Sequence, residues 1–514
     1  MDKNLLSVNN GWSKKHQQTI LFFLILFLGI FLRLYNLGKE CLWFDEAITY
    51  FRAVLGFSEI IKNSYGWDVH PPTYYLIIHF VVQLGNSEIF LRLFSTLCGI
   101  AALPLFYSLT NSVLGKREAI IATLFLALSV FHIRYSQEAR VYSFFFLVSL
   151  ISFLFFYKAV FHQNKQDWFI WAGISILNFY VHYFSLILLT SQIILYVIYS
   201  IFIKKNQLSF NHQKWFIYAF ILIIIGHIPQ FFFFFHQTAA KLNASRSYPH
   251  AIHPLYFLLI FGKNLINPIN LPSQFLDRNI KYFIGIFIFS GIAAGWKKHK
   301  KIFIVTILIV FISLLLSWMS SLFIYFGSGY RFLIFLITPY LLLLTLSVIS
   351  LTDVISDAWT KIFKVAKKRI INTFKKHLFT GILIIIVAVN LYTIFYYFTN
   401  QKKPDWQKGV SHLEKYNSDS TTIISLPEWG DYTVRYYLDQ LSYNKLKVRR
   451  IKIESTAAMD SLSSEFKNLI FITDGLLPNS QFKKETNKWL KHNATLLWQD
   501  SYFPGSCIWL TSKN

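Results

Sequence analysis

The chain has 514 residues, of which 54% are hydrophobic and only 15% are charged, with a mean hydropathy of +0.43. A soluble protein of this length has no way to hide so much apolar surface, so lipid is the expected solvent for much of the chain. The net charge of +25 is better explained by cytoplasmic loops that collect Lys and Arg than by nucleic-acid binding. The three cysteines, Cys41, Cys98 and Cys507, show neither a disulfide framework nor a metal-ligand spacing.

Apolar runs long enough to cross a bilayer recur along the chain and predict about 11 transmembrane helices. These runs lie near 19–37, 91–113, 118–134, 141–160, 167–182, 183–203, 214–235, 280–296, 302–324, 331–350 and 379–398. With the N-terminus in the cytoplasm, Lys14, Lys116, Arg117 and the Lys297–Lys301 cluster fall in cytoplasmic segments, as the positive-inside rule expects. The odd number of spans then places the C-terminal segment outside.

One apolar stretch, Pro72–Leu84, is about 13 residues long and therefore too short to span the hydrocarbon core. If it did cross, every later loop would change sides and the basic clusters would lie outside. We therefore predict a surface helix within one large first outer loop, residues 38–90.

Two segments follow the tenth predicted span. The basic stretch Asp353–His377 predicts an amphipathic helix on the inner leaflet. From about residue 399 the composition turns polar and predicts a small extracytoplasmic α/β domain. Its expected strands are Thr421–Leu426, Leu469–Thr473, Thr495–Trp498 and Cys507–Leu510, with helices at Asp431–Leu441 and Gln481–His492. The chain thus divides into a transmembrane module (1–350), the basic segment with the last span (351–398) and the C-terminal domain (399–514).

The strongest chemical signal is Trp43-Phe44-Asp45-Glu46, directly after the first span. A carboxylate at this boundary can accept a proton from an incoming hydroxyl or amine. The alternative is structural, because acids in a first helical turn complement its dipole. Further along the same loop, His70-Pro71-Pro72 forms a rigid entry to the short helix, where an anion could be held.

Two further turns carry charges on the predicted outer side. Tyr135-Ser136-Gln137-Glu138-Ala139-Arg140 joins the third and fourth spans, and it is read equally well as a structural ion pair or as a functional turn. Gly327-Ser328-Gly329-Tyr330-Arg331 opens the tenth span, and the guanidinium of Arg331 suits a phosphate. The outer loop 236–279 adds basic residues, but no spacing distinguishes one of them.

These features, in this order, resemble the GT-C glycosyltransferases, an α-helical polytopic membrane fold. The bacterial branch related to protein O-mannosyltransferases (family 39) and to the lipid A aminoarabinose transferases is the most similar. The matching residues are Asp45-Glu46, His70-Pro71-Pro72, Tyr135–Arg140, and Arg331-Phe332 with Pro339 further along. The likeness covers about the first 350 residues. The aminoarabinose transferases carry Lys where this chain has His70, so the same substrate is not implied.

The resemblance implies an inverting transfer of a sugar from a polyprenyl-phosphate donor to an extracytoplasmic acceptor, which would be a lipid, glycan or protein hydroxyl. Asp45 is the expected general base, with Glu46 as the second choice. Glu138, Arg140 and Tyr135 would shape the acceptor or support the base. Arg331, His70 and Tyr330 would bind the donor phosphate, with Arg331 stabilising its developing charge. Some relatives use a divalent metal, but no ligand spacing predicts a metal or another cofactor here.

Rival functions are a transfer of other lipid-linked groups, a transporter or flippase of lipid-linked sugars, and a scaffold without catalysis. A transporter needs a polar path through the bilayer, whereas the predicted helices are mostly apolar. The absence of a P-loop, a dinucleotide fingerprint and a nucleophile elbow argues against direct use of a cytosolic nucleotide. The sequence therefore predicts a multi-pass glycosyltransferase of the plasma (bacterial inner) membrane, with membrane lipid but no nucleic acid among its partners.

Overall fold

The computed structural model describes residues 4–67, 70–162, 164–203, 210–245, 274–322, 329–364, 367–400, 403–427, 430–453, 455–466, 468–474 and 480–512. The chain packs into two compact units. The helical unit consists of Met1–Tyr35, Phe57–Ile77 and Arg92–Phe398. The C-terminal unit consists of Asn36–Gly56, Ile78–Leu91 and Thr399–Asn514. Two pieces of the predicted first outer loop therefore pack with the C-terminal domain.

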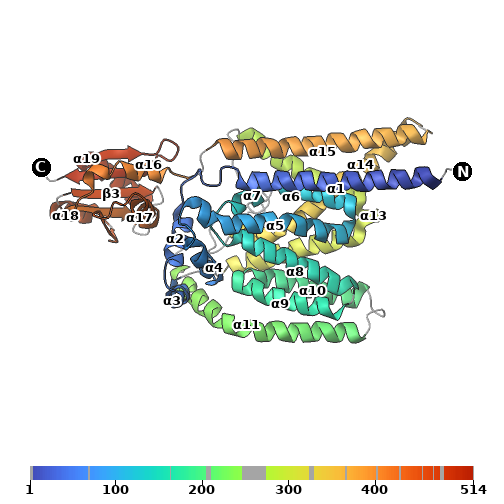
Figure 1. Cartoon of the computed structure of the whole chain (residues 1–514), viewed down its shortest axis with the longest axis horizontal. Helices are drawn as coiled ribbons and strands as arrows, with labels where there is room; N and C mark the ends of the chain where they lie inside the picture. Colours follow the sequence, from blue (N-terminus) through green and yellow to red (C-terminus); the bar gives the residue numbers. More distant parts are fainter. Residues whose placement is uncertain are drawn as a thin grey trace. The chain divides into compact units, whose positions relative to one another are not determined.

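The helical unit is built from long apolar helices that run side by side (Figure 1). In chain order the helices of this unit, long and short, are α1 (Asn4–Leu34), α3 (Phe57–Trp67), α5 (Glu88–Leu114), α6 (Lys116–Leu128), α7 (Val130–Ser136), α8 (Tyr142–His162), α9 (Lys165–Val181), α10 (Ser185–Ile198), α11 (Phe210–Ser245), α13 (Gln274–Ser321), α14 (Ile337–Ile362) and α15 (Lys368–Thr399). A π-helical turn η1 (Tyr199–Ile203) extends α10, and a 3-10 segment η2 (Gly329–Leu336) leads into α14.

Within the described residues, seven helices are long and apolar enough to cross a membrane, and eight are if α6 and α7 count as one bent span. Helices α9 and α10 correspond to two more predicted spans but are shorter, 17 and 14 residues. Helix α13 covers the two predicted spans 280–296 and 302–324. Its backbone leaves the helical conformation at His299, and Ile288 and Ile307, from either side of that break, both pack against the cluster around Phe303. The prediction of a polytopic membrane protein is confirmed.

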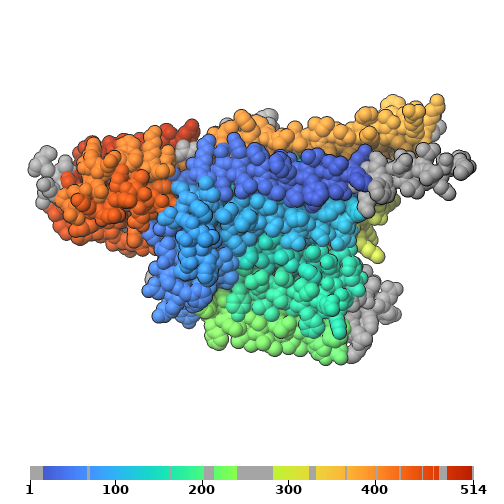
Figure 2. Space-filling view, in the orientation of Figure 1, coloured from blue at the N-terminus to red at the C-terminus, as the bar shows by residue number. Residues whose placement is uncertain are grey.

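The outward surface of the unit is apolar where lipid is expected. Helix α11 forms the lower edge in Figure 2 and exposes a row of large apolar side chains. Among them are Ile217, Ile221, Ile224, Ile225, Ile228 and Phe232. Helix α1 likewise exposes Leu24 and Phe27. In water such patches would be costly, so these helices are shaped for a hydrocarbon solvent.

Two segments were predicted to be helices on the membrane surface, and the structure shows the helical form of each. The stretch Pro72–Leu84 contains α4 (Thr73–Val82), a helix of 10 residues. At 1.5 Å per residue it is about 15 Å long, half the thickness of a hydrocarbon core, as expected for a helix that does not span. The basic stretch Asp353–His377 is not a separate helix, because it is divided between the end of α14 and the beginning of α15.

The C-terminal unit contains a five-stranded sheet in the order β2-β1-β3-β5-β4. Strands β1 (Thr421–Leu426), β2 (Lys447–Arg449) and β3 (Asn468–Asp474) are parallel, and β5 (Ser506–Ser512) pairs antiparallel with β3 and β4 (Thr495–Gln499). The accompanying helices are α16 (Trp406–Ser411), η3 (Glu414–Tyr416), α17 (Asp431–Gln440), α18 (Thr456–Glu465) and α19 (Ser480–Asn493). The buried cluster of Ile424, Met459, Phe471, Leu490 and Trp509 is its core. The predicted α/β class is confirmed, and the short β2 was missed.

The first-loop segments, residues 36–56 and 78–91, belong to this unit, and the first of them contains helix α2 (Phe44–Ala53), which packs against α17. The Phe44 ring lies 6.0 Å from that of Tyr432, and the Tyr50 ring lies 5.0 Å from that of Tyr436. Aromatic pairs at this spacing stabilise an interface beyond their buried area. The acidic pair of the first loop therefore belongs to the same compact unit as the C-terminal sheet.

Candidate active site

Asp45 and Glu46 lie in the first turn of α2 and have different surroundings. The Glu46 side chain has no exposed surface, and its Oε2 accepts from the Trp43 backbone N–H at 3.4 Å. The same oxygen lies 2.6 Å from Nζ of Lys403. Asp45 is half-buried and faces a partly open environment. Of the two adjacent acids, Glu46 is thus held in a buried ion pair, and Asp45 is the more accessible.

The Tyr135–Arg140 turn is buried in the helical unit. Glu138 Oε1 accepts from Arg134 Nε at 3.1 Å, and the Glu138 and Arg140 side chains are both buried. The Arg140 carbonyl accepts from Ser95 Oγ at 2.9 Å. On the same helix α5, Gly99 lacks a side chain, and a Cβ there would overlap with Ser136. The close approach of α5 therefore fixes the backbone of this turn.

The same turn is also fastened to the end of α1. Gln137 Nε2 donates to the carbonyls of Arg33 at 3.2 Å and Tyr35 at 2.8 Å, while its Oε1 accepts from Tyr397 Oη at 3.1 Å. One amide side chain thus joins α1, the turn and α15. Because every polar group of a buried amide needs a partner, this network determines where the turn lies.

Arg33 holds the bend that precedes the turn. Helices α6 and α7 meet at an angle of 59° around Ser129, where backbone carbonyls lose their helical partners. The fully buried Arg33 donates to Leu126 O at 3.1 Å and Ala127 O at 3.4 Å, and its Nη2 lies 2.7 Å from His132 Nδ1. Sequence reasoning missed Arg33, although an arginine inside the first apolar run was a visible signal.

A cluster of rings and cations forms at the end of the helical unit where η2 meets α8. The Arg331 guanidinium lies 5.3 Å from the Tyr142 ring centre, and the His70 ring lies 5.1 Å from the His182 ring. Phe332 contacts both histidines, at 5.4 Å from His182 and 6.1 Å from His70. The structure therefore brings together residues that are separated by more than 250 positions in the chain.

His182 is the member of this cluster that the sequence did not predict. It lies between α9 and α10, outside both helices, and its Nδ1 accepts from the Phe184 backbone N–H at 3.1 Å. The His182 ring is buried, and the guanidiniums of Arg140 and Arg331 both lie within electrostatic reach of it.

The structure thus gathers part of the predicted set within the helical unit. His70, Arg140 and Arg331 surround His182, and the Tyr135 ring lies 5.2 Å from that of Tyr142. Two guanidiniums at one end of a helix bundle suit an anion. The Tyr330 side chain and residues 246–273 of the loop 236–279 lie outside the described residues. The chemical roles of the predicted residues stay predictions.

Among the residues that the structure describes, no three His, Cys, Asp or Glu side chains form a group that could hold a metal ion. The adjacent acids Asp45 and Glu46 are only two, and Glu46 is occupied by Lys403. That the protein needs no metal or other cofactor stays a prediction.

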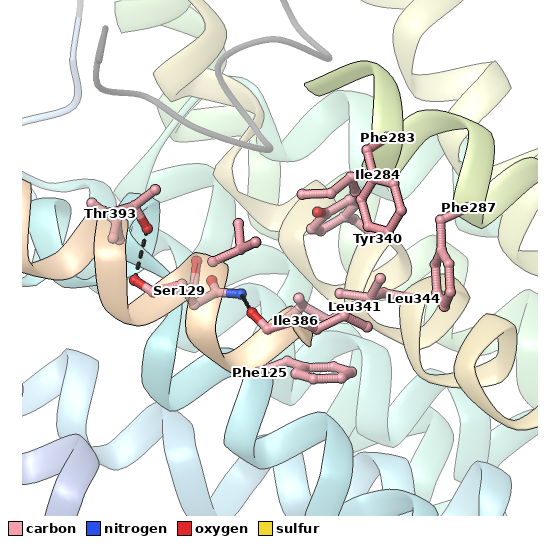
Figure 3. A pocket seen from close by; sticks show the side chains of 13 residues that line it. Phe125, Ser129, Phe283, Ile284, Phe287, Tyr340, Leu341, Leu344, Ile386 and Thr393 are labelled. Atoms are coloured by element: carbon pink, nitrogen blue, oxygen red, sulfur yellow. Dashed lines mark hydrogen bonds between the residues drawn. The ribbon is translucent and has the colours of Figure 1, made fainter. Parts of the chain in front are cut away.

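An apolar cleft lies deeper in the helical unit, between α6, α13, α14 and α15 (Figure 3). Phe125, Ile284, Phe287, Leu341 and Leu344 line it. Of its polar members, Asn390 donates to Ile386 O and Thr393 donates to Asn390 O, both at 2.8 Å, so these groups are satisfied by their own helix. The lining therefore suits an aliphatic chain rather than a polar ligand.

Comparisons with known proteins agree with this architecture. Residues 69–231 match the family model of dolichyl-phosphate-mannose-protein mannosyltransferases. An uncharacterized protein of Aquifex aeolicus (strain VF5) is 24% identical over 280 residues, which is 50% of this chain and 52% of that protein. The match thus spans about half the length of this relative.

Solved structures share the fold over nearly the whole chain. ArnT from Cupriavidus metallidurans in the apo state has a TM-score of 0.57 at 11% identity and covers 98% of both chains. ArnT bound to undecaprenyl phosphate has a TM-score of 0.50 at 11% identity, covering 96% of this chain and 97% of that one. The oligosaccharyltransferase of Archaeoglobus fulgidus, in complex with Zn and sulfate, has a TM-score of 0.52 at 10% identity, covering 96% and 73%.

The chain is therefore a polytopic membrane protein of the GT-C fold. Within that class, its residues 69–231 carry the sequence pattern of the dolichyl-phosphate-mannose-protein mannosyltransferase family. The resemblance to the GT-C fold that the motifs predicted is confirmed.

Proposed function

We propose that this protein is an inverting glycosyltransferase that moves a sugar from a polyprenyl phosphate to a hydroxyl on the extracytoplasmic side. The observation that carries the proposal is the presence of two guanidiniums, those of the buried Arg140 and the half-buried Arg331, beside His182 in a GT-C fold. Guanidiniums bind phosphate oxygens in a fork geometry, and a phosphate ester is the anion that this reaction supplies.

A donor with a lipid tail suits a phosphate site that belongs to an apolar helical unit. Its phosphate would bind Arg331 with help from His70 and Tyr330, while its isoprenoid tail would remain in apolar surroundings such as the cleft of Figure 3. A related fold, ArnT, has been solved with undecaprenyl phosphate bound.

The surroundings of the two acids favour Asp45 as the general base. A base must reach a substrate proton and must exchange it with water, which suits the half-buried Asp45. Glu46 has no exposed surface and is neutralised by Lys403 at 2.6 Å. A carboxylate in such a pair is a weak base, because protonation would leave the buried ammonium without its counter-charge.

In the proposed reaction, the acceptor oxygen attacks the anomeric carbon on the face opposite the phosphate. Asp45 takes the hydroxyl proton as the new C–O bond forms, and the bond from the anomeric carbon to the phosphate oxygen breaks. The polyprenyl phosphate leaves with the bonding electron pair, and Arg331 stabilises the charge that develops on it. Glu138, Arg140 and Tyr135 would hold the acceptor or the leaving phosphate in line. Inversion at the anomeric carbon follows from this single displacement.

The test of the base is transfer from polyprenyl-phosphate mannose in membranes that contain the full-length protein. Asp45→Asn should lower kcat by about 100- to 10,000-fold, because proton removal loses its acceptor. Glu59→Gln is the matched control, since Glu59 is exposed on α3 and should leave the rate unchanged. Wild-type transfer by Asp45→Asn would remove Asp45 from the mechanism. If wild-type protein moves the lipid-linked sugar across the bilayer without transfer, the flippase alternative holds instead.

The extracytoplasmic location of the C-terminal domain can be tested separately. The three native cysteines are buried, so a new thiol at the exposed Asp419 would give a clear signal. We expect a membrane-impermeant maleimide to label Asp419→Cys in intact cells and to leave the wild-type chain unlabelled. Labelling only after the membrane is opened would place the domain, and the site, in the cytoplasm.

A further inference from the structure

Residues from opposite ends of the chain meet around the first turn of α2 within the C-terminal unit. Lys403 follows the last residue of α15, Thr399, and its Nζ lies 2.6 Å from Glu46 Oε2. The Lys403 side chain is only 13% exposed and that of Glu46 is fully buried. Such a pair is costly to break from one side, because the remaining charge is left without a partner in a low dielectric. Lys403 therefore fixes the residue next to the proposed base.

A second contact fixes the backbone on the N-terminal side of α2. Tyr437, on α17, is buried, and its hydroxyl accepts from the Leu42 N–H at 2.7 Å and donates to Glu88 Oε1 at 2.9 Å. Burial raises the pKa of Tyr437, so the hydroxyl keeps its proton and can do both. The Tyr437 hydroxyl thereby joins Leu42, two residues before α2, to Glu88, the first residue of α5.

Other contacts of the C-terminal domain flank the same helix. Asp405 caps α16 through the Lys408 N–H at 3.1 Å, and its Oδ1 lies 3.6 Å from Cys41 Sγ. Tyr436 Oη donates to the Asn86 carbonyl at 2.7 Å. These contacts reach both first-loop segments, which is more than a tethered accessory domain would need.

From this arrangement we propose that the C-terminal domain is the positioning element for the base. Lys403 and Tyr437 hold the first turn of α2, so that Asp45 has a fixed orientation while Glu46 serves as the anchor. The inference rests on the proposed function, because it assigns the domain a role in the same transfer. Neither residue needs to touch substrate, so both are positioning residues.

The test uses the full-length protein and measures kcat and KM per folded molecule. Lys403→Met should lower kcat by about 10- to 100-fold with little change in the KM for the donor, because a base displaced by a fraction of an ångström loses its in-line geometry. Lys403→Arg keeps the positive charge and should recover at least a third of the wild-type kcat. Lys408→Met is the control, since Lys408 is exposed on the neighbouring helix α16. An unchanged kcat in Lys403→Met would overturn the proposal.

Tyr437→Phe tests the second contact with almost no change in volume. It removes the hydroxyl from Leu42 N–H and Glu88, and we expect kcat to fall by at least tenfold while the KM for the donor stays within about threefold. Tyr443→Phe is the control and should behave as wild type, because Tyr443 is half-buried just after α17 and no described hydrogen bond joins its hydroxyl to the first-loop segments. Equal kcat values for the two variants would count against the role of α17.

A measurement that needs no transferase activity separates this inference from the proposed function. In thermal unfolding of Glu46→Gln, Lys403→Met and the double variant, the double variant should melt above Lys403→Met, because both buried charges are then gone. Additive shifts would refute the anchor between Lys403 and Glu46. If the cycle shows coupling but wild-type protein transfers no sugar from any polyprenyl phosphate, the proposed function fails while the anchor stands.

Discussion

Arg33 offers a sharp test of how the site is built, because it is a fully buried cation whose described partners are backbone carbonyls and a histidine. It donates to Gly29 O at 2.8 Å, Leu126 O at 3.1 Å and Ala127 O at 3.4 Å, and it contacts His132. Arg33→Leu removes these contacts. Each bond to a charged group contributes about 1.5–3 kcal/mol. The Leu126 carbonyl still accepts from the Ser129 N–H at 3.2 Å, so its loss is partly compensated.

We therefore expect Arg33→Leu to lose about 2–4 kcal/mol of unfolding free energy, well below the sum of the separate bonds. At about 2–4 °C per kcal/mol the melting midpoint in detergent should fall by about 4–16 °C. Transfer should fall by about 100-fold, because the bend at Ser129 determines where Glu138 and Arg140 lie. Arg117→Leu is the control, since Arg117 is exposed at the other end of α6.

The assay is thermal unfolding of purified full-length protein followed by donor turnover at a temperature where each variant is folded. Arg33→Lys keeps the charge but loses the planar fork and should lie between Leu and wild type. A melting midpoint and kcat equal to wild type in Arg33→Leu would refute the view that Arg33 clamps the bend. A lower midpoint with full activity of the folded fraction would refute only its link to the Tyr135–Arg140 turn.

Two further outcomes are expected. Arg331→Met should lower kcat at least 100-fold and Arg331→Lys by less, because a lysine supplies charge without a fork, and equal activities of the two would argue against phosphate contact. Because burial raises the pKa of Cys41 to about 11, only about 0.1% of it is thiolate at pH 8, so iodoacetamide should modify it at least 100-fold more slowly than glutathione, as read by mass spectrometry.

The fold was predictable from sequence because bilayer physics constrains it strongly. Apolar runs and basic loops determined the polytopic class, and short β-rich runs located four of the five strands. The short β2 was missed, since three residues with exposed ends carry no clear periodicity. The break at His299 within α13 was visible as the basic cluster Lys297–Lys301, whereas the division of Asp353–His377 between two helices was not.

The site was only partly predictable, for a reason that Lys403 and His182 make plain. Both are single residues at the end of an apolar helix, and each matters because of a partner far away in the chain. Local spacing identifies a motif such as Tyr135–Arg140, but it does not identify which distant cation neutralises a given acid. Local spacing likewise does not reveal that Arg33 holds the bend between α6 and α7, because its partners there are backbone carbonyls, which every residue possesses.

Asp45 and Glu46 illustrate how environment assigns different tasks to adjacent acids. Neighbouring residues on a helix point about 100° apart, so one side chain can enter the interior while the other stays at its edge. Here the interior position is filled by Glu46, whose charge is balanced by Lys403. The half-buried position is filled by Asp45, the base that we propose. The anchored Glu46 thereby fixes the orientation of the neighbouring Asp45. Exchanging the two residues should therefore abolish transfer, even though the composition is unchanged.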